Sequence, residues 1–280
     1  MKNFLIVANN EKDPEGKVST MILDFLKDKG CSAGLETVTH GNVRREDLIK
    51  SAGSGAECVL VLGGDGTLIQ VAGALASMDI PLLGINLGTL GYLAEIERDQ
   101  VIPTLERLIR DDYKIEERMM LSAAVGNLKH DALNDIVITR LGDLRVVRYV
   151  VYVNGRCLTT YDADGIIVST PTGSTGYNLS AGGPIVEPCA DLILLTPICP
   201  HTINTRSVVL SSDDEISVEV SRSKYAHEYE ACLTCDGASP IRLAAGDSVD
   251  IRRAEGVTKI IKMSREGFLD VLSRKLGSNP

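Results

Sequence analysis

Three glycines surround a single aspartate in the stretch Gly63-Gly64-Asp65-Gly66-Thr67. Backbone N–H groups at a glycine-rich turn that opens a helix are unpaired and favour phosphate. A carboxylate in such a turn repels phosphate, unless a cation lies between them or the carboxylate accepts a proton from an attacking hydroxyl. Both cases describe phosphoryl transfer, in which positioning and metal electrostatics do most of the work. The simpler alternative is a strand-to-helix turn with Asp65 near the N-cap, because glycine-rich turns are common.

A second polar cluster lies between Asp164 and Pro184, where an apolar segment runs into a turn rich in glycine and hydroxyl groups. Hydroxyl groups donate and accept hydrogen bonds, so several on one turn suit the edge of a polar heterocycle or a sugar. An ordinary turn that caps a helix beginning near Tyr177 is an equally good interpretation of this stretch alone. The turn would present Thr170, Thr172, Ser174, Thr175 and Ser180.

Asn134 and Asp135 stand immediately before the apolar segment 136–138. An Asn side chain can form two hydrogen bonds with an adenine edge, and an Asp side chain can accept hydrogen bonds from ribose hydroxyls. For this dipeptide alone, however, a β-turn is the favoured interpretation.

These candidates must be positioned by the elements around them, and residues 1–113 alternate strand-like and helix-like segments, as a doubly wound sheet does. Residues 58–62 are apolar without alternation, which is typical of a strand buried on both faces. Apolar residues at helical spacing follow over 67–77. Ligands of such sheets bind at the carboxyl ends of the strands, where the glycine turn and the loop 86–92 would both lie. The other expected strands are 4–8, 35–38 and 80–86, and the other expected helices are 13–29, 45–51 and 99–111.

From residue 114 onward, helical periods give way to short alternating or β-branched segments separated by turn signals such as Asn154-Gly155. The sequence therefore predicts a Rossmann-like α/β domain over 1–113 and an all-β domain over 114–262. A tail over 263–280 holds a helix at 267–276, which we expect to pack back on the first domain. The expected strands are 119–125, 136–140, 146–153, 165–169, 193–196, 207–210, 216–220, 248–251 and 259–263.

Composition restricts the partners. The net charge of −9 without a basic block argues against nucleic acid and against an anionic membrane surface. No apolar run of about 18 residues and no signal peptide is visible, so we expect a cytoplasmic protein. Cys232 and Cys235 have a zinc-like spacing, but no second pair of ligands accompanies them, so we expect no metal there.

Taken together, these stretches resemble the NAD kinase family. The motif at 63–67 is shared with diacylglycerol kinases, sphingosine kinases and phosphofructokinases, whereas the stretch 170–175 together with Asn134-Asp135 is much more specific. The resemblance runs through most of the chain. The matching segments are 63–67, 84–93, 133–135, 164–165, 170–175, 179–184, 196–201 and 235–237.

The resemblance implies an enzyme that transfers the γ-phosphoryl group of ATP to the 2′-hydroxyl of the adenosine ribose of NAD, giving NADP. NAD would bind between the two domains, and Asp65 would orient or deprotonate the reacting hydroxyl. The glycine turn would hold phosphates together with Mg²⁺ or another divalent cation. Its phosphate-binding residues would be Gly63, Gly64, Gly66 and Thr67.

The resemblance also implies the residues that bind NAD. Asn134 and Thr172 would contact adenine, Asp135 would hold the other ribose, and Asp164 would lie at the nicotinamide end. Members of the family are usually dimers or tetramers in which a neighbour completes the site, so a homo-oligomer is implied. The remaining NAD-binding residues would be Thr175, Gly176, Tyr177, Ser180 and Tyr92.

Several positions depart from the family pattern. Asp135 stands where many members have Glu, Gly176 replaces a common Ala, and Tyr92 replaces a common Phe. Asp162 stands where some members carry Arg, which leaves the preference between NAD and NADH open.

Two other functions compete with an NAD kinase. A lipid or small-molecule kinase could share only the glycine turn, but no basic or amphipathic patch is visible that would dock a lipid. A non-catalytic NAD(P)-binding module is the other, and pure binding has no evident use for a carboxylate at Asp65.

Overall fold

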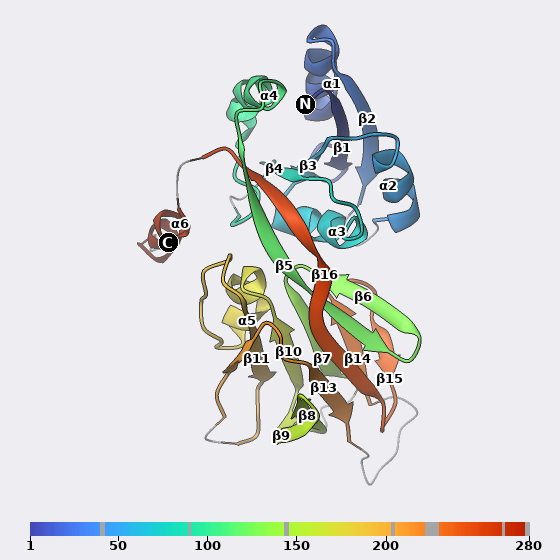
Figure 1. The fold of residues 1–280 in the computed structure, drawn as a ribbon, viewed down its shortest axis with the longest axis vertical. Helices are drawn as coiled ribbons and strands as arrows, with labels where there is room; N and C mark the ends of the chain where they lie inside the picture. Colours follow the sequence, from blue (N-terminus) through green and yellow to red (C-terminus); the bar gives the residue numbers. More distant parts are fainter. Residues whose placement is uncertain are drawn as a thin grey trace. The chain divides into compact units, whose positions relative to one another are not determined.

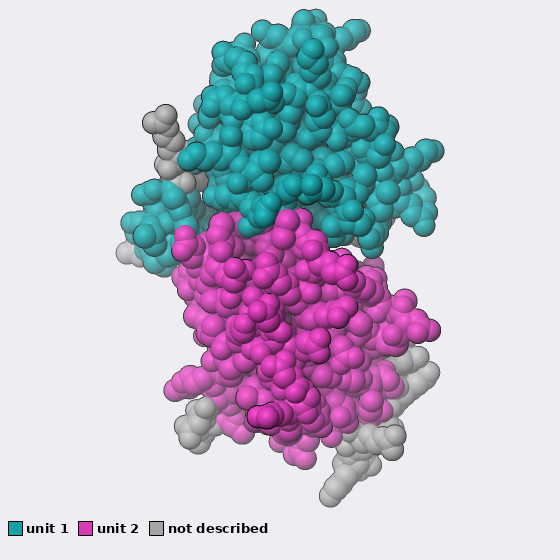
Figure 2. Space-filling view, in the orientation of Figure 1, with its two compact units in different colours: residues 1–117, 258–280 teal, residues 118–257 magenta. Residues whose placement is uncertain are grey.

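The computed structural model describes residues 1–39, 43–88, 91–142, 146–202, 205–221, 230–264 and 267–277. The chain forms two compact units, which Figure 2 shows in different colours. Unit 1 comprises Met1–Glu117 and Thr258–Pro280, and unit 2 comprises Arg118–Val257. The predicted domain limits coincide with the start of β5 (Lys114–Val125) and the end of β16 (Ser248–Lys262), whereas the contacts divide the chain inside these two long strands.

Unit 1 is built on a parallel sheet in the order β2-β1-β3-β4 (Figure 1). Every residue of β3 is buried, as expected for a strand that is covered on both faces. Beyond β4 the sheet continues with the end of β16, where Ile260 pairs with Leu82. The bounds of the four strands are β1 Asn3–Asn9, β2 Ser32–Val38, β3 Cys58–Gly63 and β4 Leu82–Asn86.

Helices pack on this sheet in two groups. α1 (Lys17–Asp28) contacts α4 (Val101–Ile109), which follows the 3₁₀ turn η1 (Arg98–Gln100), and both bury apolar residues against β1, β3 and β4. α2 (Arg45–Ala52) contacts α3 (Asp65–Ala74), and α3 contacts β3 and β4. The predicted strand-helix alternation of this half is therefore confirmed.

The first helix begins at Lys17, whereas the sequence predicted a start at Asp13. Asp13 lies in a turn before it, and its carboxylate accepts hydrogen bonds from the backbone N–H groups of Val18 (3.1 Å) and Ser19 (2.9 Å). The Asp13 carboxylate therefore accepts hydrogen bonds from N–H groups at the helix start that have no acceptor within the helix.

Unit 2 is a sandwich of antiparallel sheets. One sheet has the order β12-β11-β10-β7-β14-β15, and the second layer holds β13, β8, β9, the first half of β16 and the hairpin of β5 and β6. One apolar core lies between the layers, with Tyr149, Ile166 and Val218 fully buried in it. This confirms the β-rich second domain. The strands are β6 Leu128–Ala132, β7 Asp135–Arg140, β8 Val147–Val153, β9 Arg156–Ala163, β10 Gly165–Ser169, β11 Leu192–Ile198, β12 Val208–Ser211, β13 Ile216–Val220, β14 Ala231–Cys235 and β15 Ile241–Leu243.

Four strands were not predicted, namely β6, β9, β14 and β15, and the two expected strands near the C-terminus are one long strand, β16. β9 was missed because it lies at a sheet edge and its first three residues are exposed, so it shows no apolar alternation at its start. The turn before it did carry a signal. Asn154 (φ 50°) and Gly155 (φ 72°) both adopt positive φ between the paired residues Val153 and Arg156, as a two-residue hairpin turn requires.

The predicted C-terminal helix is present as α6 (Phe268–Gly277), and its contacts assign it to unit 1. The Lys275 ammonium lies 4.1 Å from the centre of the Tyr92 ring. Within the described ranges, no helix is both long enough and apolar enough to span a bilayer.

Candidate active site

The glycine turn lies in unit 1, where it joins β3 to α3 at the carboxyl edge of the sheet. A side chain at Gly63 would collide with Thr67, because its Cβ would lie 2.5 Å from Thr67 Oγ1. Asn9, the last residue of β1, donates a hydrogen bond from Nδ2 to the same Thr67 oxygen (3.0 Å). The turn is thus fixed to its neighbouring strand. The Thr67 N–H donates to the Gly64 carbonyl (3.1 Å), whereas the N–H groups of Asp65 and Gly66 have no acceptor inside the helix. Such groups can bind phosphate.

The Asp65 carboxylate is the first side chain of α3, and it binds the loop that follows β4. Oδ2 accepts a hydrogen bond from the backbone N–H of Tyr92 (2.6 Å), and Oδ1 accepts two, from Leu93 (3.0 Å) and Ala94 (2.9 Å). Gly91 packs so close to the carboxylate that a Cβ would not fit. A carboxylate offers about four lone-pair positions, so one remains on Oδ2. Asp65 therefore holds a loop and keeps one acceptor position for a ligand.

Thr89 and Leu90, which belong to the matching segment 84–93, lie outside the described residues.

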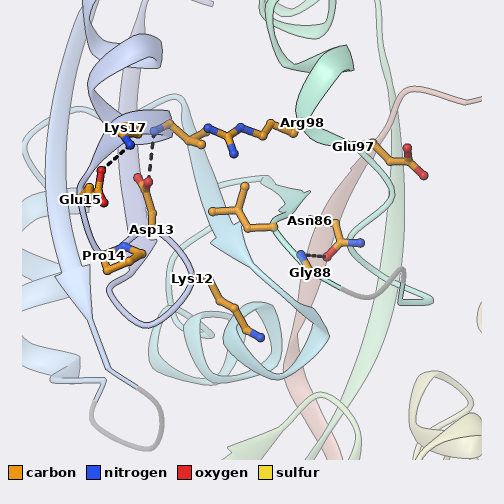
Figure 3. A pocket seen from close by; sticks show the side chains of 11 residues that line it. Lys12, Asp13, Pro14, Glu15, Lys17, Asn86, Gly88, Glu97 and Arg98 are labelled. Atoms are coloured by element: carbon orange, nitrogen blue, oxygen red, sulfur yellow. Dashed lines mark hydrogen bonds and ion pairs between the residues drawn. The ribbon is translucent and has the colours of Figure 1, made fainter.

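A pocket of about 600 Å³ in unit 1 adjoins this turn (Figure 3). Its wall is continuous with the turn, because the Leu87 N–H donates to the Gly63 carbonyl (2.9 Å) and Asn86 pairs with Gly63 in the sheet. The pocket is lined by Lys12, Asp13, Pro14, Glu15, Lys17, Val18, Asn86, Leu87, Gly88, Glu97 and Arg98.

The charges in this pocket are only partly paired. Lys17 forms an ion pair with Glu15, and Asp13 is occupied by the start of α1. Lys12 and Arg98 form no ion pair with any residue that the structure describes. Two such cations beside a helix start suit phosphate groups. Neither residue was predicted from the sequence, where their signal was their place in connections that follow the carboxyl ends of strands.

In unit 2, the Asn134-Asp135 pair lies against the hydroxyl-rich turn. β7 and β10 are antiparallel neighbours, and Asp135 pairs with Ser169, so the segment before β7 meets the turn after β10. The Thr170 N–H donates to the Asn134 carbonyl (2.8 Å). The turn continues as η2 (Thr172–Thr175) and α5 (Tyr177–Ser180). A Cβ added at Gly176 would lie 3.6 Å from Asn134 Nδ2, so Gly176 lies beside the Asn134 side chain.

Of the five hydroxyls that the turn was expected to present, two form hydrogen bonds within unit 2. The Thr170 hydroxyl donates to the Leu133 carbonyl (2.6 Å) and accepts the Gly173 N–H (3.1 Å). Ser174 Oγ forms hydrogen bonds with both backbone groups of Val186. These two residues hold the shape of the turn.

Asn134 and Thr172 carry buried polar atoms, Oδ1 and Oγ1, that have no hydrogen-bond partner among the described residues. Leaving such an atom unsatisfied costs about 1–3 kcal/mol, so native structures rarely keep one without a reason. These are the two side chains that, by the family resemblance, would contact adenine. A ligand that supplies the missing hydrogen bonds explains both atoms.

Asp135 is buried beside a second carboxylate, Asp236. Burial raises the pKa of Asp135 to about 6. Burial also raises the pKa of Asp236 to about 7, although hydrogen bonds from three backbone N–H groups oppose this shift. Residues 235–237 are among the segments that match the family resemblance, but no role for Asp236 was predicted from the sequence.

Asp164 lies at the opposite end of β10 from the turn. Gly165 pairs with Thr139, whereas Ser169 pairs with Asp135, and five residues of strand span about 16 Å. The Asp164 carboxylate accepts a hydrogen bond from Arg140 Nε (2.9 Å). Within one chain, unit 2 therefore brings Asn134, Asp135, Thr172 and Gly176 together but places Asp164 apart from them. Thr175, Tyr177 and Ser180 belong to the same turn, of which Tyr177 and Ser180 are exposed, and Tyr92 belongs to unit 1 with Asp65.

Cys232 and Cys235 point to opposite faces of β14, because they are three residues apart in a strand. They cannot share a metal ion in this arrangement. Across the described ranges, no three His, Cys, Asp or Glu side chains are grouped to hold a metal.

Comparison with solved structures supports the fold. A crystal structure of yeast NADH kinase complexed with NADH superposes with a TM-score of 0.80 at 23% identity, covering 100% of this chain and 88% of that one. An NAD kinase from Archaeoglobus fulgidus in complex with ATP gives a TM-score of 0.79 at 23% identity and covers 100% of both chains.

Sequence comparison extends over the whole chain. Residues 4–113 match the ATP-NAD kinase N-terminal domain, and residues 133–263 match the ATP-NAD kinase C-terminal domain. The NAD kinase of Agathobacter rectalis is 43% identical, with 99% of each chain covered. The NAD kinase of Lachnospira eligens is 42% identical, with 99% of this chain and 100% of the relative covered. The chain therefore belongs to the NAD kinase family.

Proposed function

We propose that this NAD kinase transfers the γ-phosphoryl group of ATP to the 2′-hydroxyl of the adenosine ribose of NAD and so makes NADP. The assignment of NAD as the phosphoryl acceptor rests on two buried side-chain oxygens that have no hydrogen-bond partner among the described residues, Asn134 Oδ1 and Thr172 Oγ1. The adenine edge supplies both donors and acceptors, so it can satisfy both atoms. The NADH bound to the yeast neighbour and the ATP bound to the Archaeoglobus neighbour support the two substrate classes.

Asp65 receives the proton of the reacting hydroxyl in this proposal. Its remaining acceptor position is on Oδ2, while its other three hydrogen bonds fix the direction of the carboxylate. A base must lie within about 2.6–3.2 Å of the oxygen that it activates. The reaction therefore requires the 2′-hydroxyl to reach this one position.

The donor phosphates would occupy the pocket beside the glycine turn. Gly63, Gly64, Gly66 and Thr67 supply the backbone of the helix start, and Lys12 and Arg98 supply positive charge. Mg²⁺ is usually held by substrate phosphates, water and one or two carboxylates. The described residues group no three His, Cys, Asp or Glu side chains, so substrate phosphates and water would supply most of the ligands of the cation. When bound, the cation neutralises charge that develops on the phosphoryl group.

The donor pocket predicts that Lys12→Gln raises the KM for ATP about tenfold, the scale of one hydrogen bond to a charged group. The KM for NAD should not change. Lys27→Gln is the matched control, because Lys27 is exposed on α1 and does not line the pocket. Steady-state kinetics with each substrate varied in turn measures both constants. An ATP KM within twofold of wild type would remove Lys12 from the donor site.

Because the Thr172 hydroxyl is proposed to bind NAD, we expect Thr172→Val to raise the KM for NAD about tenfold without lowering the free energy of unfolding. Valine keeps the shape and removes a buried hydroxyl that has no partner in the unliganded protein. Thr170→Val is the contrast, because that hydroxyl forms two hydrogen bonds inside the turn and its loss should destabilise the fold. Kinetics and thermal unfolding of both variants test this. A destabilised Thr172→Val protein with unchanged NAD kinetics would contradict the assignment.

The direct experiment is incubation of the purified protein with ATP, Mg²⁺ and NAD, followed by detection of NADP. Phosphorylation of a lipid and not of NAD would favour the lipid-kinase alternative. NAD binding without product would favour a binding module.

Two further properties belong to this proposal. A homo-oligomer, a dimer or tetramer, would allow Asp164 to serve the NAD site of a neighbouring chain, since it lies apart from Asn134 within its own chain. A cytoplasmic location agrees with Cys58 and Cys235, which are buried free thiols.

A further inference from the structure

Asp236 follows β14 directly and reaches across to the segment that precedes β7. Its Oδ2 accepts a hydrogen bond from the Leu133 N–H (2.6 Å), and its Oδ1 accepts two, from Asn134 (2.8 Å) and Asp135 (3.0 Å). Its own N–H donates to the Asp135 carbonyl (3.0 Å). One residue thus binds three consecutive N–H groups and one carbonyl of the segment.

Sheet pairing cannot replace these contacts. In a strand, successive N–H groups point to opposite sides, whereas here three in a row converge on one carboxylate, as in an anion-binding nest. Leu133 is fully buried and Asp135 nearly so, and buried N–H groups without acceptors are strongly disfavoured. The segment keeps this backbone shape because Asp236 supplies the acceptors.

The hydroxyl-rich turn holds the other side of the same segment. The Leu133 carbonyl accepts from Thr170 Oγ1 (2.6 Å), and the Asn134 carbonyl accepts from the Thr170 N–H (2.8 Å) and Ser169 Oγ (3.1 Å). The backbone is therefore held from both sides, while the Asn134 side-chain oxygen has no partner in the part of the chain that the structure describes. The arrangement fixes the backbone and leaves the amide for a ligand.

The backbone at Asp236 is itself in an uncommon conformation. Asp236 has φ 51° and Gly237 has φ 70°, and only glycine adopts this region without cost, with Asp and Asn next. Strained positions of this kind persist where the surrounding structure needs them, often beside functional sites. The turn directs the carboxylate back at residues 133–135.

We propose that Asp236 is a positioning residue of the NAD site, which orients the Asn134 amide and the Asp135 carboxylate by holding the backbone between them. The proposal rests on the proposed function. Asp236 acts through Asn134 and Asp135, so it governs NAD affinity and leaves the phosphoryl-transfer step and ATP binding untouched.

The charge around Asp236 adds a pH dependence. The titratable groups that interact with it are Asp135 on β7 and Cys235 on β14, and Cys235 is also close to Asp131 on β6. Burial raises the pKa of Asp236 to about 7, and the Asp135 charge adds to this shift against the three N–H donors. Protonation removes the negative charge that the three N–H donors bind, so it weakens their hydrogen bonds to Asp236. NAD affinity should therefore fall as the pH drops from about 8 to about 6.

The test is Asp236→Asn, which places an amide N–H₂ where an acceptor oxygen was. The expected result is an NAD KM raised about tenfold, with kcat within threefold and the ATP KM within twofold of wild type. The increase in NAD KM between pH 8 and pH 6 should be smaller in the variant. Calorimetric titration with NAD alone measures the affinity without relying on catalysis. Asp247→Asn is the matched control, because Asp247 accepts the Ala244 N–H in another turn of unit 2 (2.7 Å).

Asp236→Glu keeps the carboxylate and serves if the amide variant fails to fold. It should fold and show an NAD KM between those of wild type and the amide variant. An unchanged NAD affinity in a folded variant overturns the proposal, as does a loss of kcat at constant NAD KM. Unfolding of both variants overturns it too, since Asp236 would then support unit 2 as a whole. Failure of the proposed function would appear differently, as a wild-type protein that makes no NADP.

Discussion

Asp65→Asn is expected to lower turnover about 10²-fold or more, the scale of general acid–base effects, while NAD binding is retained. The substitution preserves size but replaces one carboxylate oxygen by an amide N–H₂. If the remaining oxygen keeps the two N–H groups of Leu93 and Ala94, the amide occupies the Oδ2 position. The acceptor position proposed for the 2′-hydroxyl is then lost. ATP binding should not weaken, because a charge that repels phosphate has been removed.

The same change also breaks the hydrogen bond from the Tyr92 N–H to Oδ2. One such bond contributes about 1 kcal/mol of stability, so a small loss in thermal unfolding is expected beside the large loss of turnover. Glu57→Gln separates the two effects. Glu57 Oε2 accepts the backbone N–H groups of Lys2 (2.5 Å) and Asn3 (2.8 Å) at the amino edge of the same sheet, away from the glycine turn.

Single-turnover and steady-state kinetics, with NAD titrations, distinguish the outcomes. Glu57→Gln should lose stability and keep its turnover, whereas Asp65→Asn should lose turnover far beyond its loss of stability. Turnover of Asp65→Asn within a few-fold of wild type would remove Asp65 from the mechanism and leave it as the residue that holds the loop after β4.

The elements that carry the site were predictable where the sequence pattern is strong. β3 is an uninterrupted apolar run followed by glycines, and such a run has few alternatives to a buried central strand. The hydroxyl-rich turn was also visible, because proline, glycine and hydroxyl residues concentrate there. The edge strand β9 was not predicted, since an exposed strand need not show apolar alternation.

The contacts inside the site were not predictable from the pattern. Asp65 binds a loop 27 residues away, and Asp236 binds a segment about one hundred residues away. Thr170, Thr172 and Ser174 look equivalent in the sequence. In the fold, the hydroxyls of Thr170 and Ser174 form hydrogen bonds with the backbone, whereas that of Thr172 has no partner among the described residues. Long-range hydrogen bonds therefore separate the residues that hold a site from those that face its ligand.

Asp65 and Asp236 illustrate this separation. Each carboxylate accepts three backbone N–H groups from a neighbouring segment, at Tyr92–Ala94 and at Leu133–Asp135. The two segments overlap stretches on which the family resemblance rests, 84–93 and 133–135. Both aspartates are partly exposed. Their proposed roles differ, because Asp65 is assigned to the reacting hydroxyl, whereas Asp236 is assigned to the backbone that carries Asn134 and Asp135.

An NAD analogue that lacks only the 2′-hydroxyl of the adenosine ribose is expected to bind but to accept no phosphoryl group. NAD contains two ribose rings and four ribose hydroxyls, and the proposed function assigns the reaction to the 2′-hydroxyl of the ribose that carries adenine. The reacting hydroxyl must reach the free position on Asp65 Oδ2 and lie in line with the γ-phosphate held at the glycine turn. Removal of one oxygen should therefore abolish the product.

Mass spectrometry of the reaction mixture measures this outcome, and competition against NAD measures binding of the analogue. The analogue that lacks the 3′-hydroxyl of the same ribose is the matched control, since it keeps the acceptor and should still be phosphorylated. Transfer to the 2′-deoxy analogue would show that another hydroxyl reacts, and that adenine does not bind at Asn134 and Thr172 in the assumed orientation. Failure of the 2′-deoxy analogue to compete with NAD would instead assign that hydroxyl to binding, because it would then contribute affinity before any phosphoryl group moves.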